Sequence, residues 1–347
     1  MICRTVSDRF SLLLMKWMIF ALIYSQLALA ESYQKTSREH CYDLDLRNQH
    51  LKEIRNQKKV AWCYAFTAAD MLTYTFDLPE KASAADEAIN YNDSSLGQFS
   101  RWLIRTFGQN STQGEQENFM MPHQTGFNKV ALDRAMRDGH CPERVFPSES
   151  WTKMSREGNK WIESQADLRT AMLEIFTLIK QQSNLSAANL PFYFHFKNVE
   201  SPETFLNLIK ASTSTNFYSN LRNVVCKDDR TEFSERFETM MYVKDGLTFS
   251  TMNKQLNRFR MIGIDYDSRL LENSHNSSIS LSELHTSSIV ARRWNDGQSE
   301  CQYLVRDSYA DQCQEYDASY ECEGGQVWID ESKIYSNLLS FVYIIKK

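Results

Sequence analysis

One cysteine stands where its side chain could act as a nucleophile. Cys63 opens the stretch 63–76, CYAFTAADMLTYTF, in which apolar residues recur at helical spacing on nearly every face. A thiolate at the start of a helix is stabilised by the unpaired N–H groups and by the helix dipole. Gln57, six residues earlier, could donate to a developing oxyanion together with the Cys63 backbone N–H. The alternative is a buried structural cysteine, which is the commoner role of a single Cys.

The segment that begins at Asn56 resembles the nucleophile segment of the papain-like cysteine peptidases. It reads Asn-Gln, five intervening residues, and then Cys-Tyr-Ala-Phe-Thr-Ala. The resemblance implies that Cys63 is the nucleophile and Gln57 the oxyanion donor. A second segment, YLVRDSYADQC, is similar to the strand of this family that ends in Asn-Ser-Trp-Gly, and it has Asp307 in the place of the Asn.

The resemblance also implies partners for the nucleophile. His285, in ELHTSSIVARRW, would be the base that pairs with the thiolate. Asp307 would orient its imidazole, and Tyr309 would shield that hydrogen bond from water. A carboxylate favours an imidazolium more strongly than an amide does, so a Cys-His-Asp triad that forms an acyl-enzyme is expected. No cofactor is implied.

In addition to Tyr309, two further residues are expected to line the substrate cleft. Gly126, in Thr-Gly-Phe, is similar to the family's glycine that pairs with the substrate backbone. Trp62 stands where the family usually has a small residue before the nucleophile, and it is expected to crowd the non-primed subsites. The other histidines weighed as the base are those at positions 123, 195 and 275.

The predicted secondary structure around these residues changes along the chain from helices to strands. Helical patterns cover 63–76, 127–138 and most of 160–245, and a short helix is expected at 252–259. Strand patterns then follow at 260–267 (half-buried), 287–294, 302–309, 326–330 and 339–345. Helices first and strands last predict the α+β class. With the resemblance, this implies a papain-like two-lobed fold, a helical lobe plus an antiparallel β lobe, with a helical insertion at about 150–250.

The N-terminus and the cysteines predict export. Residues 1–30 have a basic start, a short apolar run and a small-x-small site at Ala28–Ala30, which is typical of a signal peptide; an uncleaved anchor is the alternative. The remaining peptidase domain, 31–347, keeps seven cysteines, which predict three bridges and one free thiol in an oxidising compartment. Cys301–Cys313 is expected as one bridge. A secreted or periplasmic location follows.

Charge and composition narrow the partners. The formal charge is -5, and without residues 1–30 the 36 basic and 43 acidic residues give -7. Such a chain has no charge reason to bind nucleic acid or an anionic membrane, and no stable membrane span is expected after signal removal. No C-x-x-C or H-E-x-x-H motif indicates a metal. The oligomeric state is left open.

The sequence therefore favours an exported cysteine-type peptidase, a divergent, bacterial-type member of the papain-like family, acting on peptides or proteins. One alternative is a catalytically inactive papain-like protein that binds peptides. Another is a different thiol hydrolase or acyltransferase, such as a transglutaminase-like or cell-wall enzyme.

Overall fold

The structure is a computed structural model of the 347-residue chain. It describes residues 33–51, 53–57, 60, 62–93, 126–149, 156–157, 160–161, 222–223, 226–233, 236–273, 279–309 and 313–347. The predicted signal peptide, most of the predicted insertion, and the histidines at 123, 195 and 275 lie outside these residues.

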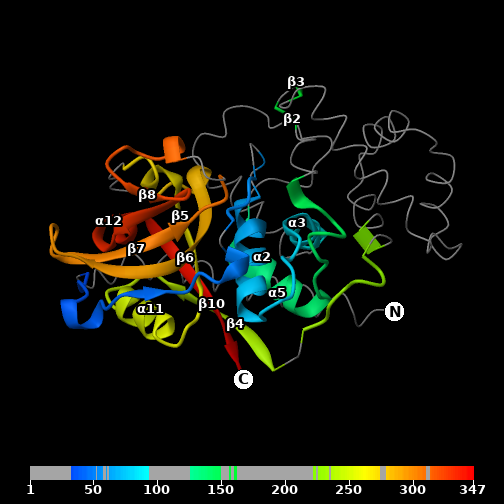
Figure 1. Cartoon of the computed structure of the whole chain (residues 1–347), viewed down its shortest axis with the longest axis horizontal. Helices are drawn as coiled ribbons and strands as arrows, with labels where there is room; N and C mark the ends of the chain where they lie inside the picture. Colours follow the sequence, from blue (N-terminus) through cyan, green and yellow to red (C-terminus); the bar gives the residue numbers. More distant parts are fainter. Residues whose placement is uncertain are drawn as a thin grey trace, which may run out of the picture.

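Three helices pack together on one side of the molecule and form what we call the helical lobe (Figure 1). They are α2 (Cys63–Thr75), α3 (Ala84–Asp93) and α5 (Asn128–Asp138). Helix α2 is buried from Cys63 to Thr73, as its all-round apolar pattern predicts. Helix α5 ends at Gly139, whose φ of 73° suits a residue without a Cβ.

Eight strands form one antiparallel sheet, the core of the β lobe. Seven follow the order β4-β10-β5-β6-β7-β9-β8, and β1 pairs with β6. Their bounds are β1 Leu44–Asp45, β4 Phe237–Val243, β5 Ile262–Asp267, β6 Leu284–Asn295, β7 Glu300–Arg306, β8 Glu321–Glu323, β9 Gln326–Asp330 and β10 Leu338–Lys346. Two helices, α11 (Thr248–Leu256) and α12 (Glu331–Asn337), complete this lobe, and β2 (Arg156–Glu157) and β3 (Lys160–Trp161) form a separate two-stranded antiparallel sheet. The α+β class is thereby confirmed.

The sheet is covered on both faces, as alternate residues of β10 show. Phe341 and Tyr343 belong to a core shared with α11 and α12, whereas Val342 and Ile344 belong to the core of the helical lobe. Because both faces are covered, all six residues of β5 are buried. The prediction of a half-buried strand at this place was therefore wrong.

The predicted helical insertion also needs a correction at its C-terminal end. Residues 237–243, FETMMYV, form β4, which pairs with β10 along its whole length and makes one edge of the sheet. The run has no Pro or Gly to separate it from the helical pattern before it. Its strand form is fixed by pairing with a segment about a hundred residues away, which local periodicity does not reveal.

Three disulfides confirm the predicted number of bridges, but the predicted pairing of Cys301 was wrong. Cys301 is bonded to Cys41, across a sequence separation of 260 residues. Cys313 is bonded to Cys322, nine residues away. The third bridge joins residues 141 and 226.

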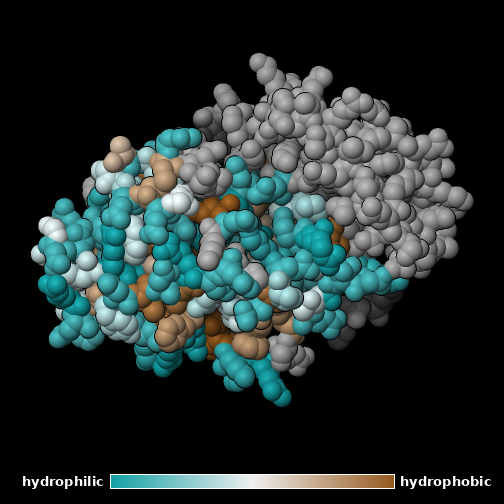
Figure 2. Space-filling view, viewed as in Figure 1, coloured by the Kyte–Doolittle hydropathy of each residue, from teal (hydrophilic) through white to brown (hydrophobic). Residues whose placement is uncertain are grey.

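The described residues contain no helix long and apolar enough to cross a bilayer. Within the same part of the chain, no cluster of His, Cys, Asp and Glu is arranged to hold a metal ion. The face seen in Figure 2 is mostly hydrophilic over both lobes, with hydrophobic residues showing in small separate areas.

Candidate active site

Cys63 is the first residue of α2 and carries a free thiol. No side chain caps the start of this helix, and its first turn has no acidic residue. The helix dipole therefore acts on the sulfur without a competing carboxylate. Cys63 is 4% exposed, and every other cysteine in the described part of the chain is disulfide-bonded.

His285 and Asp307 meet at one end of the β6–β7 pair. His285 is the second residue of β6, and Asp307 directly follows the last residue of β7. Because Ser288 is paired with Arg306, the antiparallel register brings the preceding residues of β6 beside Asp307. The His285 Nε2 atom lies 2.8 Å from Asp307 Oδ1. A carboxylate only accepts, so Nε2 carries the proton and Nδ1 is left for the thiol.

Helix α2 is tied to β6 close to this pair. Thr67, one turn after Cys63, donates from Oγ1 to the Thr286 carbonyl at 3.1 Å. Cys63 is near enough to His285 for their charges to interact. Burial of the imidazole opposes its protonation, but the charges of Asp307 and Cys63 outweigh burial and raise the pKa of His285 well above its ordinary value. This electrostatic arrangement favours the imidazolium form of His285.

Tyr309 stacks on the imidazole. The two rings are 5.7 Å apart between centroids and inclined by 8°, so the phenol lies parallel to the His285 ring and offset from it. Tyr309 also pairs with Asn56 in an antiparallel bridge. The segment before the nucleophile is thus joined directly to the segment that carries Asp307.

Gln57 is held by this junction. Its backbone N–H donates to the Ser308 carbonyl at 2.7 Å, and its side-chain Oε1 accepts from the Ser308 hydroxyl. Its Nε2 donates to the Val60 carbonyl at 3.0 Å. An amide nitrogen has two hydrogens, so one remains for an oxyanion. Gln57 is 3% exposed, and its orientation is fixed at both ends of the amide.

Gly126 lies against the ring that follows the nucleophile. A Cβ at this position would come within 2.7 Å of Tyr91 Cζ and 3.0 Å of the Tyr64 ring. Close packing against two tyrosines is therefore sufficient reason for a glycine here. Pairing of Gly126 with a substrate backbone stays a prediction.

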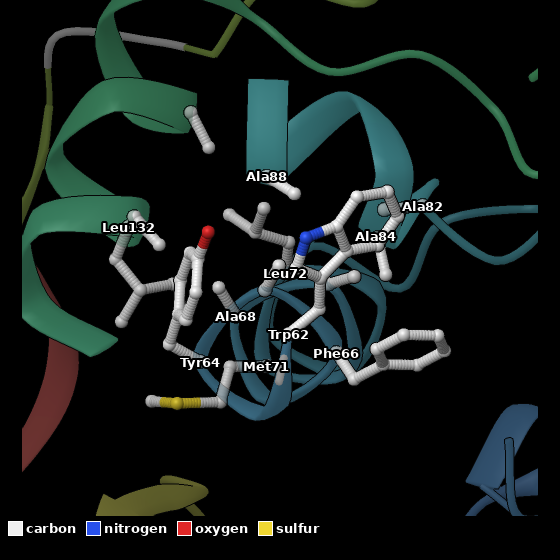
Figure 3. Packing of buried hydrophobic residues seen from close by; sticks show 14 of the residues in the cluster. Trp62, Tyr64, Phe66, Ala68, Met71, Leu72, Ala82, Ala84, Ala88 and Leu132 are labelled. Carbon is white, nitrogen blue, oxygen red and sulfur yellow. The ribbon is translucent and has the colours of Figure 1, made fainter. Parts of the chain in front are cut away.

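Trp62 does not line a subsite with its side chain, contrary to expectation. It is 1% exposed, and Figure 3 shows its indole within the helical-lobe core, near Ala82, Ala84 and Ala88. The residue before a helix can turn its side chain into the same core as the first turn. This burial overturns the expectation that Trp62 would crowd the bound substrate.

A buried ionic network, which sequence reasoning missed, lies next to the site. Asp70 of α2 pairs with Arg306, at 2.8 Å from its Nε, and with Arg55, at 3.0 Å. Burial opposes ionisation of Asp70, but the two guanidinium groups outweigh it and lower the pKa of Asp70. Arg306 immediately precedes Asp307, and Arg55 lies two residues before Gln57. In the sequence, the one hint of this network is that Asp70 follows Cys63 by two helical turns, which puts a carboxylate on the same side of α2 as the thiol.

No family model and no curated protein matches this chain. Among solved structures, the bromelain protease from Ananas comosus is 10% identical with a TM-score of 0.43, over 88% of this chain and 99% of that chain. Digestive procathepsin L 3 of Tenebrio molitor is 10% identical with a TM-score of 0.43, over 89% and 71%. PepW from Lactobacillus rhamnosis HN001 is 12% identical with a TM-score of 0.39, over 92% and 83%. At these scores the likeness carries no argument, so the site rests on its own geometry.

Proposed function

We propose that this chain is a papain-like cysteine peptidase that hydrolyses peptide bonds through Cys63, His285 and Asp307. The observation that carries the proposal is the 2.8 Å hydrogen bond between His285 and Asp307, with the free thiol at the start of α2 near enough to interact with the imidazole electrostatically. In this mechanism the thiolate attacks the scissile carbonyl, and a C–S bond forms. The oxyanion is held by Gln57 and the Cys63 N–H.

The second half of the reaction returns the enzyme to its starting state. The imidazolium of His285 gives its proton to the leaving amine as the C–N bond breaks. Neutral His285 then takes a proton from water, which attacks the thioester and releases the acid. Asp307 accepts from His285 and stabilises its imidazolium form whenever that form is present. The substrate is a peptide or protein, and we propose export through the N-terminal signal, which the three disulfides support.

Labelling by a peptide-like electrophile, such as a peptidyl epoxide, tests this function. Wild type should gain one label, located at Cys63 by mass spectrometry, and should cleave an unstructured protein. Cys63→Ala should take no label and lose at least about 10⁴-fold in cleavage rate. A cell-wall preparation serves as the comparison substrate: hydrolysis of it alone would favour a different thiol hydrolase. Equal labelling of Cys63→Ala would refute the proposal.

The second candidate, a catalytically inactive protein that binds peptides, is favoured by one observation. Cys63 is 4% exposed, so only a small part of the nucleophile is open to a substrate. That candidate predicts peptide binding with no label and no cleavage. The same experiment therefore separates the two functions.

A further inference from the structure

Two hydroxyl groups extend the hydrogen bonding of the triad into the sheet. Ser287 Oγ donates to Asp307 Oδ1 at 3.1 Å, and the Tyr266 hydroxyl lies 2.8 Å from Ser287 Oγ. Both residues are fully buried. A continuous line of hydrogen bonds thus runs from β5 across β6 to the residue after β7, and ends at the imidazole.

The register of the strands explains how the line is built. Ser287 is two residues after His285 on β6, so both side chains lie on the same face of the sheet. Tyr266 is paired with His285 across the β5–β6 ladder, and its ring stands edge-on to the imidazole at 5.5 Å. The two strands therefore present a hydroxyl and an aromatic wall to the same histidine.

The two oxygens of Asp307 are unequal. Oδ1 accepts from His285 Nε2, from Ser287 Oγ and from the Ser308 backbone N–H at 2.8 Å. Oδ2 is buried and has no hydrogen-bond partner among the residues that the structure describes. Tilting the carboxylate away from this position would weaken all three bonds, so the donors hold it in the orientation that presents one oxygen to the imidazole. Buried carboxylates need such donors to stay ionised.

The direction of the hydroxyl bonds follows from the carboxylate. Asp307 only accepts, so the single hydrogen of the Ser287 hydroxyl is donated to its Oδ1. The Tyr266 hydroxyl therefore donates to Ser287 Oγ, and burial and the negative charge of Asp307, which raise the pKa of Tyr266 well above its ordinary value, keep the phenol protonated. Tyr266 thereby holds Ser287 in the donating direction.

We propose that Ser287 is a positioning residue of the triad, held by Tyr266, which lets this chain use an Asp as the partner of His285. The proposal rests on the proposed function, since it assigns a role to Asp307 in maintaining the thiolate–imidazolium pair. Ser287 acts through Asp307 and touches neither the thiol nor the substrate. Loss of the Ser287 hydroxyl should weaken the ion pair most at acidic pH, because a carboxylate that has lost a hydrogen-bond donor is protonated more readily.

The test is the rate at which iodoacetamide alkylates Cys63 between pH 4 and pH 10, with the disulfides intact. Ser287→Ala should slow alkylation roughly ten-fold at pH 5, because a hydrogen bond to a charged group is lost, and leave it nearly unchanged at pH 9. Ser340→Ala is the matched control, since Ser340 is also buried in this sheet and donates to another carboxylate, Asp265, at 2.8 Å. Its profile should match wild type within about two-fold at both pH values.

Two further variants test whether Ser287 affects Cys63 alkylation through Asp307 and is itself held by Tyr266. Tyr266→Phe, which removes only the hydroxyl, should slow alkylation at pH 5 by about three-fold; it also carries the test if Ser287→Ala does not fold. In an Asp307→Asn background, adding Ser287→Ala should change the rate less than about two-fold, because no carboxylate remains to be stabilised. A ten-fold loss in that background would show that Ser287 does not act through Asp307.

Three further outcomes would also overturn the proposal: equal losses in Ser287→Ala and Ser340→Ala, no loss in Ser287→Ala and Tyr266→Phe, or a wild type whose Cys63 does not react at acidic pH. Alkylation needs no peptide substrate. A wild type that reacts at pH 5 and shows the expected variant profile, yet cleaves no peptide, would refute the peptidase function and leave this role of Ser287 standing.

Discussion

Asp307 and Asp265 are two buried carboxylates of the same sheet, and each accepts three hydrogen bonds. At Asp307 all three reach one oxygen, and one comes from the imidazole of His285. At Asp265 they are divided between both oxygens, and all come from neutral groups, namely the Asn128 backbone N–H, Thr286 Oγ1 and Ser340 Oγ. The number of accepted hydrogen bonds is the same, but of the two carboxylates only Asp307 has a partner that can carry positive charge.

This difference separates a chemical role from a structural one. Burial raises the pKa of Asp265, and its three neutral donors only partly offset burial. What Asp265 does is join α5, through the first N–H of that helix, to β6 and β10. Asp307 instead stands in a chain of charges that ends at Cys63. Counting hydrogen bonds alone would not distinguish the two.

The largest expected contrast is in peptide hydrolysis. Asp307→Ala should lower kcat/KM by roughly 10²–10⁴-fold, because His285 loses both its orientation and the charge that favours its imidazolium. Asp265→Ala should retain kcat/KM within about ten-fold, measured below the temperature at which the variant unfolds. Similar losses in both variants would erase the distinction.

The free energy of unfolding should depend more strongly on Asp265 than on Asp307. Asp265→Ala leaves three donors without an acceptor, and should lower the free energy of unfolding by about 2–4 kcal/mol. Chemical denaturation with the disulfides intact measures this loss, and Asp265→Asn, which keeps one acceptor oxygen, should lose less. If Asp265→Ala proves as stable as wild type, the proposed tie between α5 and the sheet has no energetic weight.

Asp307→Asn should lower kcat/KM less than Asp307→Ala does. Its oxygen can still accept from His285, so kcat/KM should stay within about ten-fold of wild type. Asp307 raises the pKa of His285, so an amide should lower it again. The basic limb of the pH–rate profile should therefore move to lower pH. Complete loss of activity would contradict the assignment of Asp307.

The smallest expected effect is on how stability depends on pH. The folded-state pKa of Asp265 is raised above its unfolded value, so its contribution to stability is present at pH below about 4 and is lost as pH rises through the folded pKa. Asp265→Asn does not titrate. Its free energy of unfolding should therefore fall less than that of wild type as pH rises from 4, which denaturation at a series of pH values measures.

Sequence reasoning succeeded where a local pattern determines the structure. The apolar run after Cys63 predicts α2, and residues 326–330 form β9 as their pattern predicts. Resemblance and strand order named His285 and Asp307, which the register then brings into contact. Each of these rests on residues close in the chain or on a known order of motifs.

It failed where distant residues decide the outcome. Cys41 is far in the chain from Cys301, and no spacing rule selects this partner over Cys313. Trp62 is buried because α3 packs beside it. The residues next to Trp62 in the sequence do not reveal this packing. Ser287 was within reach, because a residue two positions from His285 on a strand shares its face, but only the structure shows that Asp307 lies opposite.

The three bridges differ in their access to solvent, and this affects how the thiol of Cys63 can be kept reduced. Cys41 and Cys301 are at most 1% exposed, and the 141–226 bridge is fully buried, whereas Cys313 is exposed and Cys322 half-buried. A mild reductant should therefore open the short loop 313–322 first, just after the stacked Tyr309. Activity should therefore be highest at an intermediate concentration of the thiol reductant. Above that concentration, reduction of the 313–322 bridge should loosen the position of Tyr309 beside His285, while the other two bridges stay intact.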